Sequence, residues 1–234
     1  ETIFVNEDIA YLGTLNYAFI VLDVSDPKYP NEIARVAQGI DDVWEFDVKD
    51  TLLFVASEDT GLKIFDISNP AELNEIGSIQ YPDLYSSVSC VRVKNDVAYV
   101  SVASFIYSID ISDPAHPQVI QGLDLGGYAL SIVIENNFIY RIGARLTVLD
   151  ISDPADMQLV GYYPLRGVQI SVKNNLIYAS CQNPTIAFIQ FDGPTSINEN
   201  ELILTSFNLL QNYPNPFNPS TTIFYNIPEN ERGN

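Results

Sequence analysis

A short string recurs along this chain: an apolar residue, an aspartate, isoleucine or valine, serine, aspartate or asparagine, and proline. The aspartates of the four clear copies are Asp23, Asp66, Asp110 and Asp150, and a degenerate fifth copy is centred on Asp192. Successive aspartates lie 43, 44, 40 and 42 residues apart. A period of about 40 to 45 residues, rich in β-branched and aromatic residues, is typical of propeller blades. We therefore predict an all-β fold, a β-propeller of four-stranded antiparallel blades with about five units in this chain.

A polar hairpin turn followed by an apolar run forms a second fixed feature of each unit. The turns are Glu7-Asp8, Asp50-Thr51, Asn95-Asp96, Asn136-Asn137 and Asn174-Asn175. Asn and Asp adopt positive φ at little cost, so these pairs favour tight hairpins. In the third unit the pattern predicts strands over residues 89–94, 98–102, 106–111 and 118–123. The first unit lacks part of its innermost strand and the last lacks its outermost, so we expect the chain to be a fragment of a larger propeller.

The aspartates of the recurring string also suggest a metal site, because each string brings two carboxylates together. A turn explains them better, since Asp and Ser side chains accept hydrogen bonds from backbone N–H groups two residues further on. A scaffold needs such a turn in every blade, whereas a binding site usually breaks a repeat. The longer run of alternating acids that a calcium loop requires is absent. We predict that these aspartates cap turns and bind no metal.

Composition limits the partners of the chain. Eleven basic against 30 acidic residues give a formal charge of −19, which disfavours nucleic acid and anionic membrane surfaces. No apolar run reaches the roughly 18 residues that a membrane helix needs, so membrane insertion is not expected. Cys90 and Cys181 lie in strands of non-adjacent units, and we expect free thiols rather than a disulfide. No cofactor motif was identified.

The recurring string continues into a short strand, such as Glu32-Ile33-Ala34-Arg35-Val36 or Glu75-Ile76-Gly77-Ser78-Ile79. This arrangement resembles the repeat of the LVIVD-repeat family over about residues 1–192, strongly in four units and weakly in the fifth. The resemblance implies a β-propeller of bacterial, mostly extracellular proteins whose biochemical roles are largely unassigned.

The composition changes after the last repeat. Residues 193–202 are polar and have the character of a linker, and residues 203–234 form a separate segment. Within it, residues 207–228 resemble the opening of the type A sorting domain of the type IX (Por) secretion system. The motif residues are Asn212, Tyr213, Pro214, Asn215, Pro216, Phe217, Asn218 and Pro219. The resemblance implies a truncated β-sandwich segment, export through the secretion machinery, and a secreted or cell-surface location in a bacterium.

The irregular loops indicate where a binding site would lie. In a propeller, the crossovers between blades and the loops between the second and third strands of a blade share one face, away from the regular turns. Aromatic and charged residues gather in these loops, and aromatic rings offer contact area while carboxylates give direction. The candidate ligand-binding residues are Asp41, Asp42, Trp44, Asp83, Tyr85, Tyr128, Tyr163 and Arg166. Packing of the aromatic residues between blades is the alternative explanation.

Two functions fit these observations. The first is a non-catalytic, secreted or surface-displayed module that binds a protein or glycan ligand or acts as a scaffold. The second is a hydrolase acting on glycans, with paired carboxylates at the central channel. Convergence of Asp41 or Asp42 with Asp83 to about 5–10 Å would favour the hydrolase. No Ser/His/Asp arrangement and no paired acids can be identified in the sequence, so we expect binding without catalysis.

Overall fold

The computed structural model describes residues 2–14, 18–36, 39–40, 42–58, 60–80, 88–181 and 186–191. This part of the chain consists of 19 β-strands joined by turns and loops and contains no helix, as the sequence predicted. In particular, no helix among these residues is long and apolar enough to cross a membrane.

The strands form five antiparallel sheets, each built from consecutive strands of one repeat. Blade 1 comprises β1 (Thr2–Asn6), β2 (Ile9–Thr14), β3 (Ala18–Asp23) and β4 (Asn31–Val36). Blade 2 comprises β5 (Val43–Lys49), β6 (Leu52–Ser57), β7 (Gly61–Asp66) and β8 (Asn74–Ile79). Blade 3 comprises β9 (Val88–Lys94), β10 (Val97–Val102), β11 (Phe105–Asp110) and β12 (Gln118–Asp124). Blade 4 comprises β13 (Ala129–Glu135), β14 (Phe138–Gly143), β15 (Leu146–Asp150) and β16 (Gln158–Tyr163). Blade 5 comprises β17 (Gly167–Lys173), β18 (Leu176–Cys181) and β19 (Ile186–Gln190).

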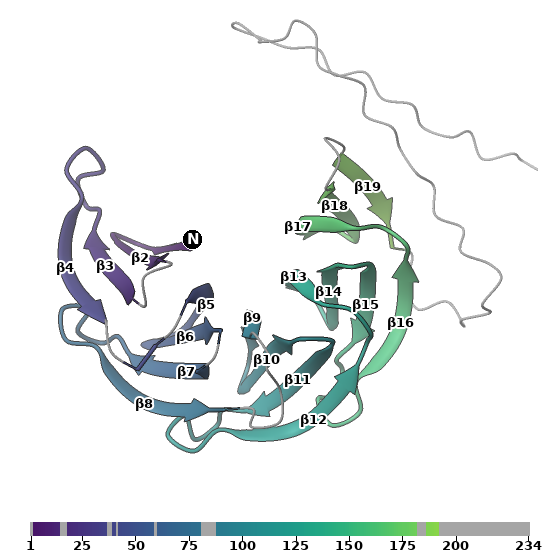
Figure 1. Ribbon diagram of the computed structural model, residues 1–234, viewed down its shortest axis with the longest axis horizontal. Helices are drawn as coiled ribbons and strands as arrows, with labels where there is room; N and C mark the ends of the chain where they lie inside the picture. The colour runs from purple at the N-terminus through teal and green to yellow at the C-terminus, as the bar shows by residue number, and fades with distance from the viewer. Residues whose placement is uncertain are drawn as a thin grey trace, which may run out of the picture.

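The five blades stand side by side in an arc that is open between blade 1 and blade 5 (Figure 1). The first strand of each blade lies on the inner side of the arc, where it neighbours the first strands of the adjacent blades. The fourth strand, where the blade has one, lies on the outer rim. The propeller architecture predicted from the repeat is therefore confirmed.

The core lies between the blades. Each second strand carries an aromatic residue at the same place, three residues after the hairpin turn, directed toward the following blade. In blades 1 to 4 these residues are buried and belong to the apolar cores: Tyr11, Phe54, Tyr99 and Tyr140. The fifth copy, Tyr178, has no following blade in the arc, and 38% of its surface is exposed. Burial between sheets, rather than within one sheet, is what holds the repeats together.

The first strands repeat this arrangement on the opposite side of the blade. Phe46, Val91, Ile132 and Ile170 occupy the same repeat position, and all four are buried against the preceding blade. Ile3 occupies this position in blade 1 and is 63% exposed, because blade 1 has no predecessor in the arc. Blade 1 and blade 5 thus each leave one apolar face exposed at the end of the arc, whereas the equivalent faces of the other blades are covered by a neighbouring blade.

The recurring aspartates cap turns, as predicted. The carboxylates of the four aspartates accept the backbone N–H of the serine two residues on, at 2.8–2.9 Å: Asp23, Asp66, Asp110 and Asp150. The aspartate or asparagine before the proline of the recurring string makes a similar hydrogen bond. In blade 4, for example, Asp153 Oδ1 accepts the N–H of Ala155 at 2.9 Å. The Ser25 hydroxyl and N–H lower the pKa of Asp23, and the Ser68 and Ser112 groups lower the pKa of Asp66 and Asp110 in the same way.

The inner hairpins also match the prediction, with positive φ at Glu7, Asp50, Asn95, Asn136 and Asn174. These angles, between 52° and 54°, repeat at the same position of every blade, as tight two-residue hairpins require. Cys90 and Cys181 are free thiols, also as expected.

One assignment within the fifth unit was wrong. Strand pairing sets Leu176 opposite Gln190, just as Phe138 lies opposite Asp150. Gln190, and not Asp192, therefore takes the place of the turn aspartate in blade 5. Asp192, the linker at 193–202, the segment 203–234 and its sorting motif lie outside the described residues.

Candidate pocket at the hub of the blades

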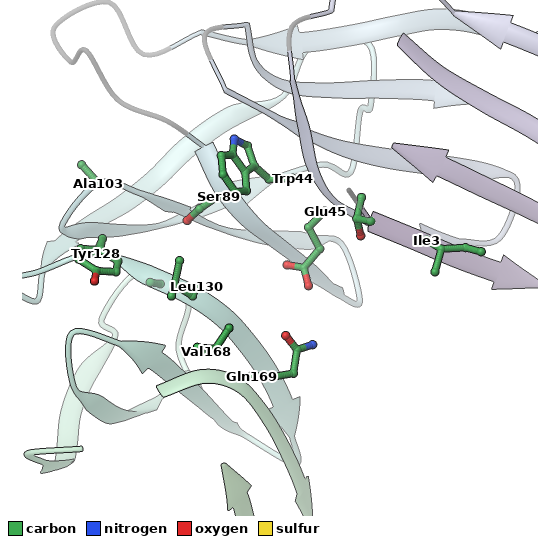
Figure 2. Close-up of a pocket in the computed structure, with 11 residues that line it drawn as sticks. Ile3, Trp44, Glu45, Ser89, Ala103, Tyr128, Leu130, Val168 and Gln169 are labelled. Atoms are coloured by element: carbon green, nitrogen blue, oxygen red, sulfur yellow. The ribbon is translucent and has the colours of Figure 1, made fainter. Parts of the chain in front are cut away.

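A hollow of about 650 Å³ opens at the inner side of the arc (Figure 2). This volume lies within the roughly 300–1,000 Å³ of small-molecule sites. All five blades contribute to its lining, mainly through the beginnings of their first strands: Thr2, Ile3, Trp44, Glu45, Ser89, Ala103, Tyr128, Ala129, Leu130, Val168 and Gln169.

Four lining residues occupy one and the same repeat position. Trp44, Ser89, Leu130 and Val168 each lie two residues before the buried inter-blade residue of their first strand. Each of the four is the extra residue of a β-bulge, where the first strand pairs with the second strand of its blade. The bulge interrupts the alternation of side chains, so this residue leaves the packed core at the inner side of the arc, the hub. Packing between blades does not fix the residue type at this position, which is tryptophan in one blade and serine in the next.

Two aromatic side chains dominate the hub pocket (Figure 2). Trp44 is 42% and Tyr128 44% exposed, so each presents part of its ring to the hollow. The Trp44 indole Nε1 donates to Glu58 Oε2 at 3.3 Å, which orients the ring. Leu130 and Val168 add an exposed aliphatic wall. Large aromatic surface left partly uncovered in a concave site is typical of ligand recognition.

Glu45 is the carboxylate that borders the hub pocket, and both of its oxygens are engaged. Oε1 accepts from Arg92 Nη2 at 2.5 Å, and Oε2 accepts the backbone N–H of Val91 at 3.1 Å. Burial raises the pKa of Glu45, while the Arg92 guanidinium opposes that shift. Two residues on, Asp47 accepts the N–H of Val93 at 2.6 Å. The two carboxylates therefore accept hydrogen bonds from the free backbone N–H groups of β9, and they do not form an unengaged pair facing the pocket.

Of the eight predicted site residues, the structure brings Trp44 and Tyr128 together in the hub pocket. Asp42 does not line it, and its Oδ1 is buried without a hydrogen-bond partner among the described residues. Tyr163 packs against the core between blades 4 and 5, and Arg166 is exposed but borders no part of the pocket. Asp41, Asp83 and Tyr85 lie outside the described residues.

Sequence reasoning missed Ser89, Leu130, Val168 and Gln169. For the first three the signal was available, because the repeat position that they share with Trp44 varies from blade to blade, whereas the position two residues later is always apolar. No group of three or more His, Cys, Asp or Glu side chains able to hold a metal ion occurs in the part of the chain that the structure describes.

Solved structures share this architecture at low sequence identity. A Bacteroides fragilis protein described as a 6-phosphogluconolactonase matches with a TM-score of 0.67 and 14% identity over 87% of this chain and 68% of its own. A chain of the mitotic checkpoint complex matches with a TM-score of 0.67 and 12% identity over 80% and 62%, respectively. The computationally designed protein Ika8 matches with a TM-score of 0.54 and 12% identity over 79% and 68%. Such likeness establishes the fold alone.

Comparison with curated proteins gave no match. The family model of the LVIVD repeat, however, matches residues 1–38, 41–80, 87–123 and 126–164, which are the four clear repeats. These segments make up more than half of the 234 residues, and each coincides with one four-stranded blade. The chain therefore belongs to the LVIVD repeat family.

Proposed function

We propose that the chain is a non-catalytic binding module whose hub pocket takes an uncharged ligand with a flat apolar face, such as a neutral oligosaccharide. The observation that carries this proposal is the pair of half-exposed rings, Trp44 and Tyr128, across one hollow. The C–H face of a sugar ring packs on an aromatic ring, and its hydroxyls bond to amide and hydroxyl groups such as those of Gln169 and Ser89.

The charge distribution supports an uncharged ligand. The chain carries a formal charge of −19, which repels polyanions. A cationic ligand would need a free carboxylate in the pocket, but Glu45 is already bound by Arg92 and by the Val91 N–H. The same engagement argues for binding rather than hydrolysis, because a glycosidase needs two carboxylates that reach the scissile bond.

The C-terminal segment supports a secreted or cell-surface role. Residues 207–228 resemble the opening of a type A sorting domain, and a hub pocket for external glycans fits a displayed protein. Fusing residues 203–234 to a reporter in a bacterium with a type IX secretion system would test export. Accumulation of the reporter outside the cell, lost on replacing the motif at 212–219, is the expected result.

Binding is tested with an array of neutral, acidic and amino oligosaccharides and of peptides. The wild-type chain should bind neutral glycans, and Trp44→Ala and Tyr128→Ala should each weaken binding by about tenfold or more, as expected for aromatic anchors that a ligand covers. Tyr29→Ala is the matched control, because Tyr29 is 77% exposed and lies away from the hub. Binding that survives both pocket substitutions, binding only to peptides, or turnover of a glycan would each contradict the proposal.

A further inference from the structure

Arg141 breaks the repeat inside the core. It lies in the middle of β14 and is fully buried, with 0% exposure. The same position of the second strand holds Leu12, Val55, Val100 and Ala179 in the other blades. Val55, Val100 and Ala179 are buried in the apolar cores and face the preceding blade. A guanidinium in this place has no counterpart elsewhere in the described arc.

The placement of Arg141 is costly for folding. Its Nε and Nη1 have no hydrogen-bond partner among the described residues, and burial lowers its pKa to about 10. Asp124 and the buried Cys90 act on it only through space, and Arg145 adds a second positive charge nearby. A buried charge with unsatisfied donors destabilises a core that an apolar side chain would fill. The repeat shows that apolar residues suit this position.

Among the described residues, the Arg141 side chain makes one hydrogen bond, and it goes to a crossover loop. Its Nη2 donates to the carbonyl oxygen of Gly127 at 2.5 Å, and Arg145 Nη2 donates to the carbonyl oxygen of Leu125. Both carbonyls belong to the loop of residues 125–128, which joins β12 to β13 and ends in Tyr128 of the hub pocket.

This loop needs outside support because its backbone is unusual. Gly126 and Gly127 both adopt positive φ, 63° and 75°, which glycine permits but does not enforce. A side chain at Gly127 would meet the Cβ of Ala144 at 2.7 Å, so the loop sits tightly against the β14–β15 turn. The carbonyl of Tyr128 in turn accepts the Ala144 N–H at 3.2 Å.

We propose that Arg141 is a positioning residue, which fixes the crossover loop 125–128 so that the ring of Tyr128 stands in the hub pocket. It acts through Gly127 and touches no ligand itself. The inference rests on the proposed function for the role of Tyr128, but the effect of Arg141 on the loop is independent of any ligand. The strand thus keeps a residue that weakens the core because that residue holds the site.

The test replaces Arg141 by methionine, which keeps the length of the side chain and removes its charge and donors. Stability should stay at or above that of the wild type. Amide exchange at Leu125, Gly126 and Ala144, whose N–H groups are bonded within this region, should accelerate about tenfold. Val100→Met places the same side chain at the equivalent position of blade 3 and is the control. It should leave exchange at these three amides unchanged.

Arg141→Lys provides the rescue, because an ammonium group can still donate to the Gly127 carbonyl. Its exchange should stay close to that of the wild type, and a fluorotyrosine signal from position 128 should move in Arg141→Met but not in Arg141→Lys. Exchange in Arg141→Met that is unchanged, or that rises equally in all blades, would overturn the proposal. Neither readout requires a ligand, so failure of glycan binding would leave this result intact and would count only against the proposed function.

Discussion

Tyr99 and Tyr178 are the same residue at the same repeat position, and they differ in whether another blade covers them. Tyr99 is buried between blades 3 and 4, among apolar residues that include Ile132 and Leu149. Tyr178 lies on the face of blade 5 that no other blade in the arc covers. Its ring contacts Phe188 edge to face, with 5.5 Å between the ring centroids. Replacing each by alanine therefore isolates the energy of packing between blades.

The expected magnitudes follow from burial. Removing a fully buried aromatic side chain costs about 3–5 kcal/mol, and we expect that cost for Tyr99→Ala. Tyr178→Ala loses one aromatic pair and part of its apolar contact, and we expect about 1–2 kcal/mol. A difference of about 2 kcal/mol between the variants corresponds to about 4–8 °C in the unfolding midpoint of a chain of this size.

Urea unfolding followed by far-UV circular dichroism measures both variants. Trp44 is the only tryptophan, so its fluorescence reports blade 2 separately from the average over all strands. This second signal matters because end repeats of a repeat protein can unfold on their own. Equal losses for Tyr99→Ala and Tyr178→Ala would refute the reasoning, since they would mean that stability comes from within each sheet and not from burial between blades.

Two further predictions concern single residues, and a third concerns the turn aspartates. Tyr140→Phe should stabilise the fold by about 1 kcal/mol, since the buried hydroxyl has no partner among the described residues. Burial raises the pKa of Tyr140 from 10.0 to about 12. The neutral phenol therefore contributes stability that is fully present below pH 10 and is lost as the pH rises through about 12. Thermal melts at alkaline pH should show a smaller loss of stability in Tyr140→Phe than in the wild type. Ala103→Gly should raise the unfolding free energy by about 1 kcal/mol in urea titrations, because Ala103 holds a φ of 50°. The pKa is lowered in three turn aspartates: Asp23, Asp66 and Asp110. Thermal melts of the wild type should therefore show a loss of stability between pH 5 and pH 3. A variant with asparagine at all three positions should lose less stability over the same range.

The sign of this acid effect follows from the folded state. A lowered carboxyl pKa means that the ionised form stabilises the fold above the unfolded pKa of 3.8, and protonation below that value removes the contribution. Asparagine keeps the acceptor oxygen without the charge, as Asn69 already does in blade 2, where it accepts the N–H of Ala71 at 3.2 Å. An unchanged pH dependence in the triple variant would assign acid sensitivity to other carboxylates.

The blades could be predicted from sequence because every local signal agrees. The Asp-Ile-Ser-Asp-Pro turn, the polar hairpin and the alternation of apolar residues each recur with the same spacing, so one reading of a blade applies to all of them. The predicted strands of blade 3 match β9 to β12 within one residue at every end. Blade 5 was misaligned by two residues because Gln190 replaced the marker aspartate and Asp192 lay close by.

The hub pocket was harder to predict because it depends on distance from an axis that no single repeat reveals. Trp44 and Tyr128 were found as unusual aromatic residues in loops, but the same criterion selected Tyr163, which packs between blades. Arg141 was not predicted, because its burial follows from its place between two blades and not from the residues beside it. Comparing it with Val55 and Val100, position by position, would have exposed it as a buried exception.

These positions also explain why fold similarity says little about the ligand. Packing between blades requires mostly apolar residues at the inter-blade positions but no particular sequence, so proteins at 12–14% identity can share the fold. The hub position carries no such restriction, and this one chain already uses tryptophan, serine, leucine and valine there. A relative with the same blades can therefore present a different pocket. Ligand class in this family should be compared at the hub position and at the loop that Arg141 holds, rather than over the whole alignment.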